Sequence, residues 1–270
     1  MRAVVLVDNI GNALAKGEWG LSIYIEHRDK RILLDTGASG LFVENAHKYE
    51  VPVEKVDYAV LSHGHYDHSY GMRDFFRVNS KASFYLRSDS GENCYFKKWF
   101  IRKYIGIPRG ILEEERARIE PVTGDYRLME GAWLIPHKLE GRSEIGRREN
   151  MYVKKKEGWF PDDFSHEQSL VLETDKGLVI FNSCSHAGAD AVLQEVQETF
   201  PDKKLYALAG GFHIFRKSSA EVRRLAERLA AFDIEKIYTG HCTGQRSYEV
   251  LKSILGDRAE QLRVGLEIQV

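Results

Sequence analysis

The chain is poor in cysteine, in net charge and in long apolar runs. Its three cysteines, an odd number among 270 residues, argue against a disulfide framework and favour a reducing cytoplasm. A net charge of -1 argues against nucleic acid or an anionic membrane as a general partner. No run approaches the length of a membrane span. Residues 1–8 are too short an apolar stretch for a signal peptide and instead predict a first strand.

What the chain does contain is enough apolar surface for a substantial core. Hydrophobic residues make up 43% and aromatic residues 11% of the sequence. No internal repeat or low-complexity stretch is present. Strand patterns followed by helix patterns occur in both halves, which predicts two sheets packed face to face with helices outside. The length allows one large domain or a core with an insertion.

The most informative stretch is residues 62–68, with the sequence Ser-His-Gly-His-Tyr-Asp-His. It follows an apolar run that predicts a buried strand. His63 and His65 are two residues apart, so in an extended segment they point the same way. Asp67 and His68 fall past the turn and can face a second point. Imidazole and carboxylate suit zinc, iron or manganese, so this stretch predicts a site for one or two divalent cations.

Two further histidines follow predicted strands. His186 comes shortly after the strand pattern of residues 178–181, and His241 follows that of residues 235–238. A histidine at a strand end is well placed to complete a site begun elsewhere on the sheet edge. We therefore expect His186 to join His63 and His65 on one ion, and His241 to join Asp67 and His68 on the other.

Three residues are candidates for supporting roles. Asp35 ends a predicted strand, where it can orient a ligand histidine or cap the helix expected after residue 39. Cys184 could bind zinc as a thiolate, although Asp163, His166 or water could equally supply the extra ligand. His213 follows the paired glycines 210–211 and can bind substrate, move a proton or serve the structure alone.

Four segments together resemble the metallo-β-lactamase superfamily: residues 33–37, 62–68, 182–188 and 238–244. The last two, with residues 210–213, resemble the branch that includes the dihydropterin–ribofuranosylaminobenzene phosphate synthase of methanopterin biosynthesis. The resemblance implies an α/β four-layer αββα sandwich, an orienting role for Asp35, and an Asp67 that binds metal and accepts a proton. Many members carry a bridging aspartate at this strand end, whereas this chain has Ser183 and Cys184 in the neighbourhood and no aspartate, which leaves the number of ions open.

The middle of the chain changes in character. From residue 87 to residue 158, aromatic and basic residues interleave and charge runs appear. We interpret residues 1–86 and 159–270 as the metallo-β-lactamase core and residues 87–158 as an inserted cap that contributes to substrate binding. Its arginines and lysines could hold a phosphate or a carboxylate.

These features favour a metal-dependent hydrolase that acts on a small ester or phosphoester through activated water. The catalytic candidates are Asp67 and His213, and zinc is the expected metal, with manganese, magnesium and iron as alternatives. The same ions could serve a pterin transferase that displaces diphosphate, an iron-dependent redox protein, or a metal-binding protein without turnover. We expect a small-molecule substrate that can be phosphorylated, and no membrane or nucleic-acid partner; a homodimer through the insertion stays open.

Overall fold

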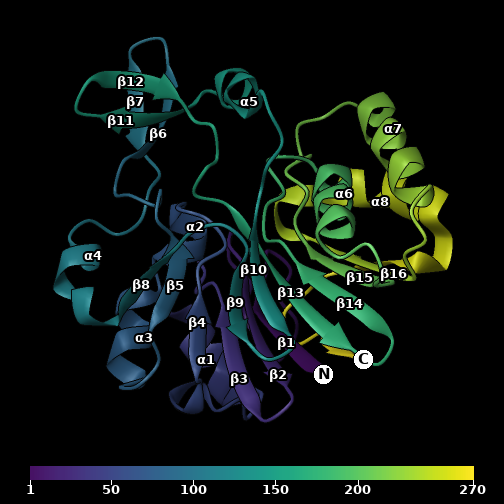
Figure 1. The fold of residues 1–270 in the computed structure, drawn as a ribbon, viewed down its shortest axis with the longest axis horizontal. Helices are drawn as coiled ribbons and strands as arrows, with labels where there is room; N and C mark the ends of the chain where they lie inside the picture. Colours follow the sequence, from purple (N-terminus) through teal and green to yellow (C-terminus); the bar gives the residue numbers. More distant parts are fainter.

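Two seven-stranded sheets pack face to face in the computed structural model, which describes residues 1–270 (Figure 1). The first sheet has the order β18 (Glu267–Gln269), β1 (Arg2–Val7), β2 (Ser22–His27), β3 (Lys30–Leu34), β4 (Tyr58–Val60), β5 (Phe84–Arg87), β8 (Ile119–Val122). The second has the order β17 (Ala259–Gln261), β16 (Lys236–Thr239), β15 (Leu205–Gly210), β14 (Gly177–Phe181), β13 (Gln168–Thr174), β10 (Ala132–Pro136), β9 (Tyr126–Met129).

Helices cover the outer surfaces of both sheets (Figure 1). The helices are α1 (Leu41–Lys48), α2 (Tyr66–Ser69), α3 (Met72–Val78), α4 (Ile111–Glu114), α5 (Arg142–Glu149), α6 (Ala189–Thr199), α7 (Ser219–Ala230) and α8 (Gln245–Leu255). Helices α1 and α3 pack on the first sheet, and α6, α7 and α8 pack on the second. None of the helices combines the length and the apolar character that crossing a bilayer requires.

The alternation of side chains along β1 shows how the layers form. Ala3 and Val5 point into the core between the two sheets, whereas Val4 and Leu6 point toward α1 and α3. Both faces of the strand are buried, so it reads as a continuous apolar run rather than an alternating one. The four layers of the predicted αββα sandwich are therefore confirmed, with one core between the sheets and one under each helical layer.

A third, small sheet stands apart from the sandwich (Figure 1). Its order is β12 (Gly158–Pro161), β11 (Met151–Lys155), β6 (Cys94–Lys98), β7 (Ile101–Tyr104). The limits 87–158 predicted for the insertion need correction, because β8, β9 and β10 fall inside that range yet belong to the two large sheets. Val122 and Leu134 anchor these strands in the core between the sheets. β8 is only four residues long and contains Glu120 and Pro121, and β10 is only five residues long, so neither gives a strong strand pattern.

The strands that carry the candidate ligands end at one edge of the sandwich. β3 and β4 run parallel in the first sheet, and β14, β15 and β16 run parallel in the second. The carboxyl ends of parallel strands lie at the same edge of a sheet. Because the two sheets face each other, the loops after these five strands can meet.

Candidate metal centre

The stretch from residue 62 to residue 68 follows β4 and includes the first three residues of the short helix α2. His65 has extended backbone and precedes α2, while Asp67 and His68 lie within that helix. Asp35 follows β3 in a left-handed conformation, with φ of 59°. Its carboxylate accepts hydrogen bonds from the Ser62 backbone N–H at 2.7 Å and from the Ser62 hydroxyl at 2.7 Å. This pairing fixes the start of the turn against the neighbouring strand.

The structure brings His63, His65 and His186 together into a first cluster. One ring nitrogen of each lies within 4.8 Å of one from each of the others. The His186 ring stacks on Phe164, with centroids 4.4 Å apart and an angle of 6° between the planes. All three imidazoles are buried. The combination predicted from the sequence for one ion is therefore compact in space.

The electrostatics of this first cluster favour cation binding. Burial, followed by the charge of neighbouring histidines, lowers the pKa of His63 and His186 well below the usual value. Burial also lowers the pKa of His65 to about 3. Neutral imidazoles are the form that binds a metal. His63 Nε2, His65 Nε2 and both ring nitrogens of His186 are buried without a hydrogen-bond partner. Such atoms cost about 1–3 kcal/mol each, and a bound cation would satisfy them.

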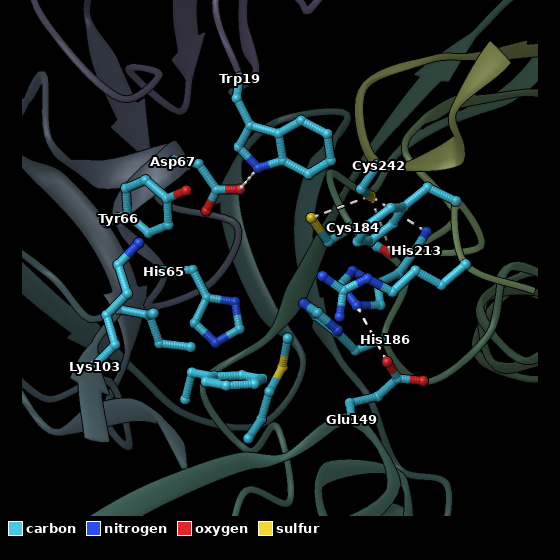
Figure 2. Close-up of a pocket in the computed structure, with 15 residues that line it drawn as sticks. Trp19, His65, Tyr66, Asp67, Lys103, Glu149, Cys184, His186, His213 and Cys242 are labelled. Atoms are coloured by element: carbon cyan, nitrogen blue, oxygen red, sulfur yellow. Dashed lines mark hydrogen bonds and ion pairs between the residues drawn. The ribbon is translucent and has the colours of Figure 1, made fainter. Parts of the chain in front are cut away.

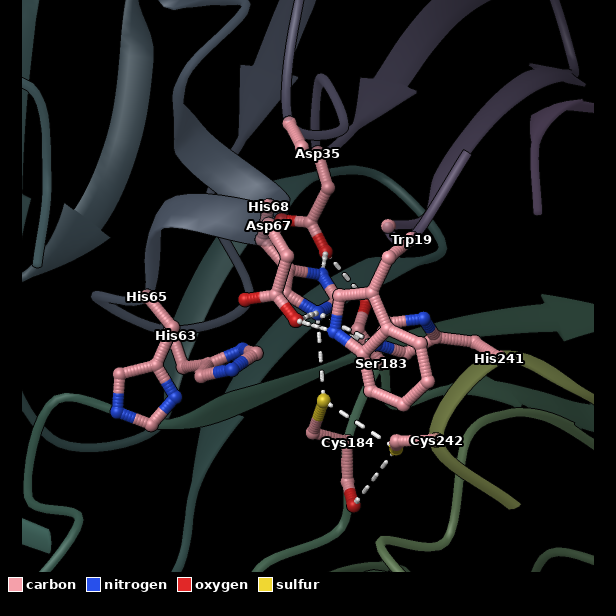
Figure 3. A network of polar contacts seen from close by, with 12 residues as sticks. Trp19, Asp35, His63, His65, Asp67, His68, Ser183, Cys184, His241 and Cys242 are labelled. Atoms are coloured by element: carbon pink, nitrogen blue, oxygen red, sulfur yellow. Dashed lines mark hydrogen bonds and ion pairs between the residues drawn. The ribbon is translucent and has the colours of Figure 1, made fainter. Parts of the chain in front are cut away.

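A second cluster contains Asp67, His68 and His241. His68 Nε2 lies 3.2 Å from His241 Nε2, and Asp67 Oδ2 lies 3.5 Å from His241 Nε2. The Trp19 indole N–H donates to Asp67 Oδ2 at 2.9 Å (Figure 3). His241 follows β16 in a left-handed conformation, with φ of 45°. Burial lowers the pKa of His241 to about 3, so this ring is neutral as well.

Neighbouring oxygen atoms orient the rings of this second cluster. His68 Nδ1 lies 2.8 Å from Asp35 Oδ2, so the ring donates to that carboxylate and turns Nε2 toward the cluster. His241 Nδ1 lies 3.1 Å from the side-chain oxygen of Asn9, with the same effect. Ser183 also donates to Asp35 Oδ2. The helix-capping alternative for Asp35 is wrong, because Gly40 occupies the N-cap position of α1.

Two cysteines adjoin these histidines. Cys184 Sγ lies 3.2 Å from His68 Nε2 and 3.4 Å from Cys242 Sγ (Figure 3). Cys184 also groups with His63 and His68, and separately with His186 and His213, within 4.8 Å. It therefore stands between the first and second clusters. Burial and the nearby Cys242 raise the pKa of the Cys184 thiol well above its usual value.

Sequence reasoning missed Cys242 and Asn9. Cys242 is the residue directly after His241, and Asn9 follows the first strand by two residues. Each stands at the carboxyl end of a strand, which is the signal that identified His186 and His241. Neither was singled out, because cysteine and asparagine at a strand end are common without any function.

In another buried group of potential ligands, the histidine at the centre, His166, has hydrogen-bond partners without a cation. His65, Cys94, Asp162 and His166 lie within 4.8 Å of one another. However, His166 Nε2 donates to Asp162 Oδ2 at 3.1 Å, and His166 Nδ1 accepts the backbone N–H of Gly64 at 3.1 Å. Both nitrogens of His166 are thus occupied. The hydrogen bond from Gly64 to His166 holds the backbone next to His65 in place. His166 has no free nitrogen left for a metal.

His213 lies at the edge of the first cluster. Its ring centroid is 4.3 Å from that of His186, and its Nε2 is 3.7 Å from Glu149 Oε2. Burial lowers the pKa of His213, but Cys242 and Glu149 outweigh burial and raise it to about 9. At neutral pH this ring is therefore a cation, unlike the rings of His63, His65 and His186.

Both clusters border a cavity of about 460 Å³. Figure 2 shows Trp19 and Asp67 on one side of it and His213 and Glu149 on another. Its wall includes residues of the small sheet and of the segment that joins this sheet to the core. The remaining lining residues are His65, Tyr66, Phe96, Lys103, Ile105, Met151, Cys184, His186, Phe215, Arg216 and Cys242.

Comparison with known proteins agrees with this geometry. Residues 20–169 match the family model described as the metallo-beta-lactamase superfamily. The chain belongs to this superfamily. A solved structure described as Tm1679, a metal-dependent hydrolase of the beta-lactamase superfamily, superposes with a TM-score of 0.85 and 25% identity. The superposition covers 100% of this chain and 99% of that chain.

Two curated relatives of this superfamily member come from Methanocaldococcus jannaschii. One is a 7,8-dihydropterin-6-methyl-4-(beta-D-ribofuranosyl)-aminobenzene-5'-phosphate synthase, 26% identical over 91% of this chain and 88% of the relative. The other is an uncharacterized protein, 26% identical over 93% of both chains. The predicted superfamily and the likeness to the synthase branch are confirmed. The superfamily implies a divalent metal, and the orphaned nitrogens of the first cluster fit one.

Proposed function

We propose that this protein is a metal-dependent hydrolase of a small ester or phosphoester. The observation that carries this proposal is the pair of adjoining donor clusters that border one cavity. His63, His65 and His186 would hold one divalent cation, and Asp67, His68 and His241 a second. Such cations lower the pKa of water and neutralise charge that develops on a carbonyl or phosphoryl oxygen.

Asp67 is the residue proposed to move the proton. Its carboxylate lines the cavity and is held by the Trp19 indole N–H at 2.9 Å. That hydrogen bond fixes the direction of Oδ2, while Oδ1 accepts no hydrogen bond from the protein. A carboxylate in this position can accept a proton from attacking water and return it to the leaving group, a role typically worth 10²–10⁴-fold in rate.

Charged and aromatic side chains in the cavity indicate the substrate class. Lys103 and Arg216 line it, and their charged groups lie over the rings of Tyr66 and Phe215. His213 also lines it with its pKa raised to about 9, and its charge is paired with that of Glu149. Trp19 and Phe215 present aromatic surface to the same space. These features suit a flat, anionic small molecule, including a phosphorylated one.

A transferase that displaces diphosphate from a dihydropterin is the second candidate. The similarity to the synthase over 91% of the chain favours it, and the aromatic wall would accept a flat pterin ring. Both reactions would use the same cations. An iron-dependent redox protein and a metal-binding protein without turnover are the remaining alternatives, and the complete donor set argues against the last.

The test compares turnover by metal-free protein with that of protein reloaded with zinc, manganese or iron. Substrates should include bis(p-nitrophenyl) phosphate, p-nitrophenyl phosphate, a lactone, and a dihydropterin diphosphate with its arylamine partner. We expect hydrolysis that requires the metal and that falls by roughly 10²–10⁴ in Asp67→Asn. Asp163→Asn is the matched control, because Asp163 is exposed and lies outside both clusters.

Three outcomes separate the candidates. Hydrolysis without added arylamine supports the leading proposal. Diphosphate release that depends strictly on the arylamine supports the transferase instead. If neither reaction occurs while iron-loaded protein consumes oxygen, the hydrolytic proposal is wrong and the redox alternative replaces it.

A further inference from the structure

The hairpin of β6 and β7 ends in two exposed aromatic side chains. Trp99 and Phe100 form the two-residue turn between the paired residues Lys98 and Ile101. Their side chains are 81% and 87% exposed, more than any other large hydrophobic residue of the chain, and Ile101 beside them is 48% exposed. The hairpin belongs to the small sheet that stands apart from the sandwich (Figure 1). Contiguous apolar surface of this kind marks a contact site.

The backbone of this turn is unfavourable for the residue that begins it. Trp99 has a left-handed conformation, with φ of 53°. A two-residue hairpin turn with positive φ at its first position normally has glycine there, because a bulky side chain is strained in that conformation. Tryptophan therefore lowers the stability of the hairpin, and its exposed ring adds little packing in return. Such a residue indicates a role outside the fold.

Basic side chains surround the tip of this hairpin. Residues 94–104 contain four basic residues and no acidic one, namely Lys97, Lys98, Arg102 and Lys103. Residues 151–161, which form the other hairpin of the small sheet, add three lysines and one glutamate. The net charge of the whole chain is -1, so the rest of the chain is acidic. The expectation of no membrane partner depended on that average, which conceals the separation of charge.

We propose that residues 98–101 form a tip that docks this protein on an anionic lipid bilayer. Aromatic and apolar side chains enter the boundary between headgroups and acyl chains, while lysine and arginine bind the anionic headgroups. The proposal does not depend on the proposed function. Phe96 and Lys103 of the same hairpin line the cavity, so docking by the tip would hold the cavity close to the bilayer.

Two other occupants fit the tip less well. A second copy bound tip to tip would place the basic residues of one hairpin against those of the other, and like charges repel. Single-stranded nucleic acid stacks its bases on open aromatic rings. However, the charged groups of Lys97 and Arg102 lie 5.6 Å and 5.2 Å from the ring centroid of Trp159. That ring of the sheet is therefore occupied, and Ile101 at the tip offers no stacking surface.

Sedimentation with lipid vesicles tests the proposal. The vesicles contain phosphatidylcholine alone or an equal mixture of phosphatidylcholine and phosphatidylglycerol. We expect the wild-type protein to bind the mixed vesicles, and the binding to weaken as the salt concentration rises. The tip variant, Trp99→Gly with Phe100→Asn, should bind roughly tenfold or more weakly, because it removes both aromatic side chains. Its Gly-Asn sequence suits the turn, so thermal unfolding should show equal or higher stability.

A second pair of variants tests the role of charge. Lys98→Glu should weaken binding to the mixed vesicles roughly fivefold or more, because a basic residue near an anionic surface contributes about that factor. Lys48→Glu is the matched control, since it changes the net charge equally at an exposed lysine of α1, outside the small sheet. The control should bind the mixed vesicles as the wild type does.

Four outcomes would overturn the docking proposal. These are no binding of the wild type to mixed vesicles, equal binding to phosphatidylcholine alone, equal binding by the tip variant, and equal weakening by Lys98→Glu and Lys48→Glu. If the wild type ignores vesicles while the tip variant loses a dimer or a single-stranded oligonucleotide, the tip belongs to that partner instead. Vesicle binding needs no turnover, so bound protein without hydrolysis would overturn the proposed function alone.

Discussion

Asp35 Oδ2 lies 2.8 Å from His68 Nδ1, and this contact joins the end of β3 to the helix that carries two candidate ligands. The same oxygen accepts the hydroxyl of Ser62, and Oδ1 accepts its backbone N–H. One carboxylate thus fixes both the turn and the direction of an imidazole. In many metal sites a partner of this kind tunes the ligand histidine.

Asp35→Asn should weaken metal binding by roughly 10–100-fold, because the amide cannot accept every hydrogen bond that the carboxylate now accepts. Competition with a chromophoric chelator measures the change in affinity. Asp57→Asn is a suitable control, since Asp57 also accepts a backbone N–H, from Arg31 at 2.8 Å. Asp57 lies directly before β4, at the opposite end of that strand from Ser62. Equal affinities for Asp35→Asn and wild type would show that Asp35 does not orient His68.

Trp19→Phe should lower kcat with little change in KM, because phenylalanine keeps an aromatic wall but cannot donate to Asp67. A hydrogen bond to a charged group is worth about 1.5–3 kcal/mol, so the loss should be roughly ten- to hundredfold. Steady-state kinetics measures it, on whichever of the test substrates named above the wild-type protein turns over. Trp133→Phe, which packs against Phe200 away from the cavity, should keep full activity. A rise in KM alone would assign Trp19 to substrate binding.

Gly211→Ala should destabilise the protein and disturb the second cluster, whereas Gly64→Ala should be tolerated. A Cβ at Gly211 would meet Cys242 Sγ at 2.5 Å and the Ser183 carbonyl at 2.8 Å, while the nearest atom to one at Gly64 is 3.7 Å away. Overpacking of this kind costs typically 1–3 kcal/mol. Thermal unfolding and metal content measure both effects. Equal loss in the two variants would contradict the close approach at Gly211.

His137 should make stability depend on alkaline pH. Its Nδ1 lies 2.7 Å from Glu195 Oε2, and Glu167 and Glu195 outweigh burial to raise the pKa of His137 from 6.5 to about 9. The raised pKa means that stability is fully present below pH 6.5 and is lost as the pH rises to 9, by at most roughly 3 kcal/mol.

Urea unfolding between pH 6 and pH 10 measures this loss. His137→Gln should reduce the slope of the pH profile in that window, because glutamine does not titrate, and the slope that remains comes from His213 and other groups whose pKa is raised. His47→Gln is the control, since His47 is exposed in α1. If His137→Gln keeps the wild-type slope, another group titrates there.

Much of the candidate site was predictable because its residues follow strand patterns within short motifs. His63, His65, Asp67 and His68 are close in sequence, so local geometry alone brings them together. His186 and His241 could be assigned because the carboxyl ends of parallel strands meet. The contact of Cys184 with Cys242 spans 58 residues, and no local pattern marks it.

The limits of the insertion were harder to predict. β10 is a five-residue strand between charged segments, and its membership of the second sheet depends on pairing with β13 about 36 residues later. Such pairing depends on contacts distant in sequence rather than on the strand's own composition. The cavity wall was equally hard to predict from the sequence, because it combines residues of the small sheet with loops of both large sheets.

The most direct test of the account is the metal content of protein purified in zinc-supplemented, chelator-free buffer. The account predicts close to two metal equivalents for the wild type, and close to one for His65→Ala and for His241→Ala, since each removes a ligand of one cluster. His47→Ala should keep two. A wild-type protein with no bound metal, or variants with unchanged metal content, would contradict the assignment of both clusters as a metal centre.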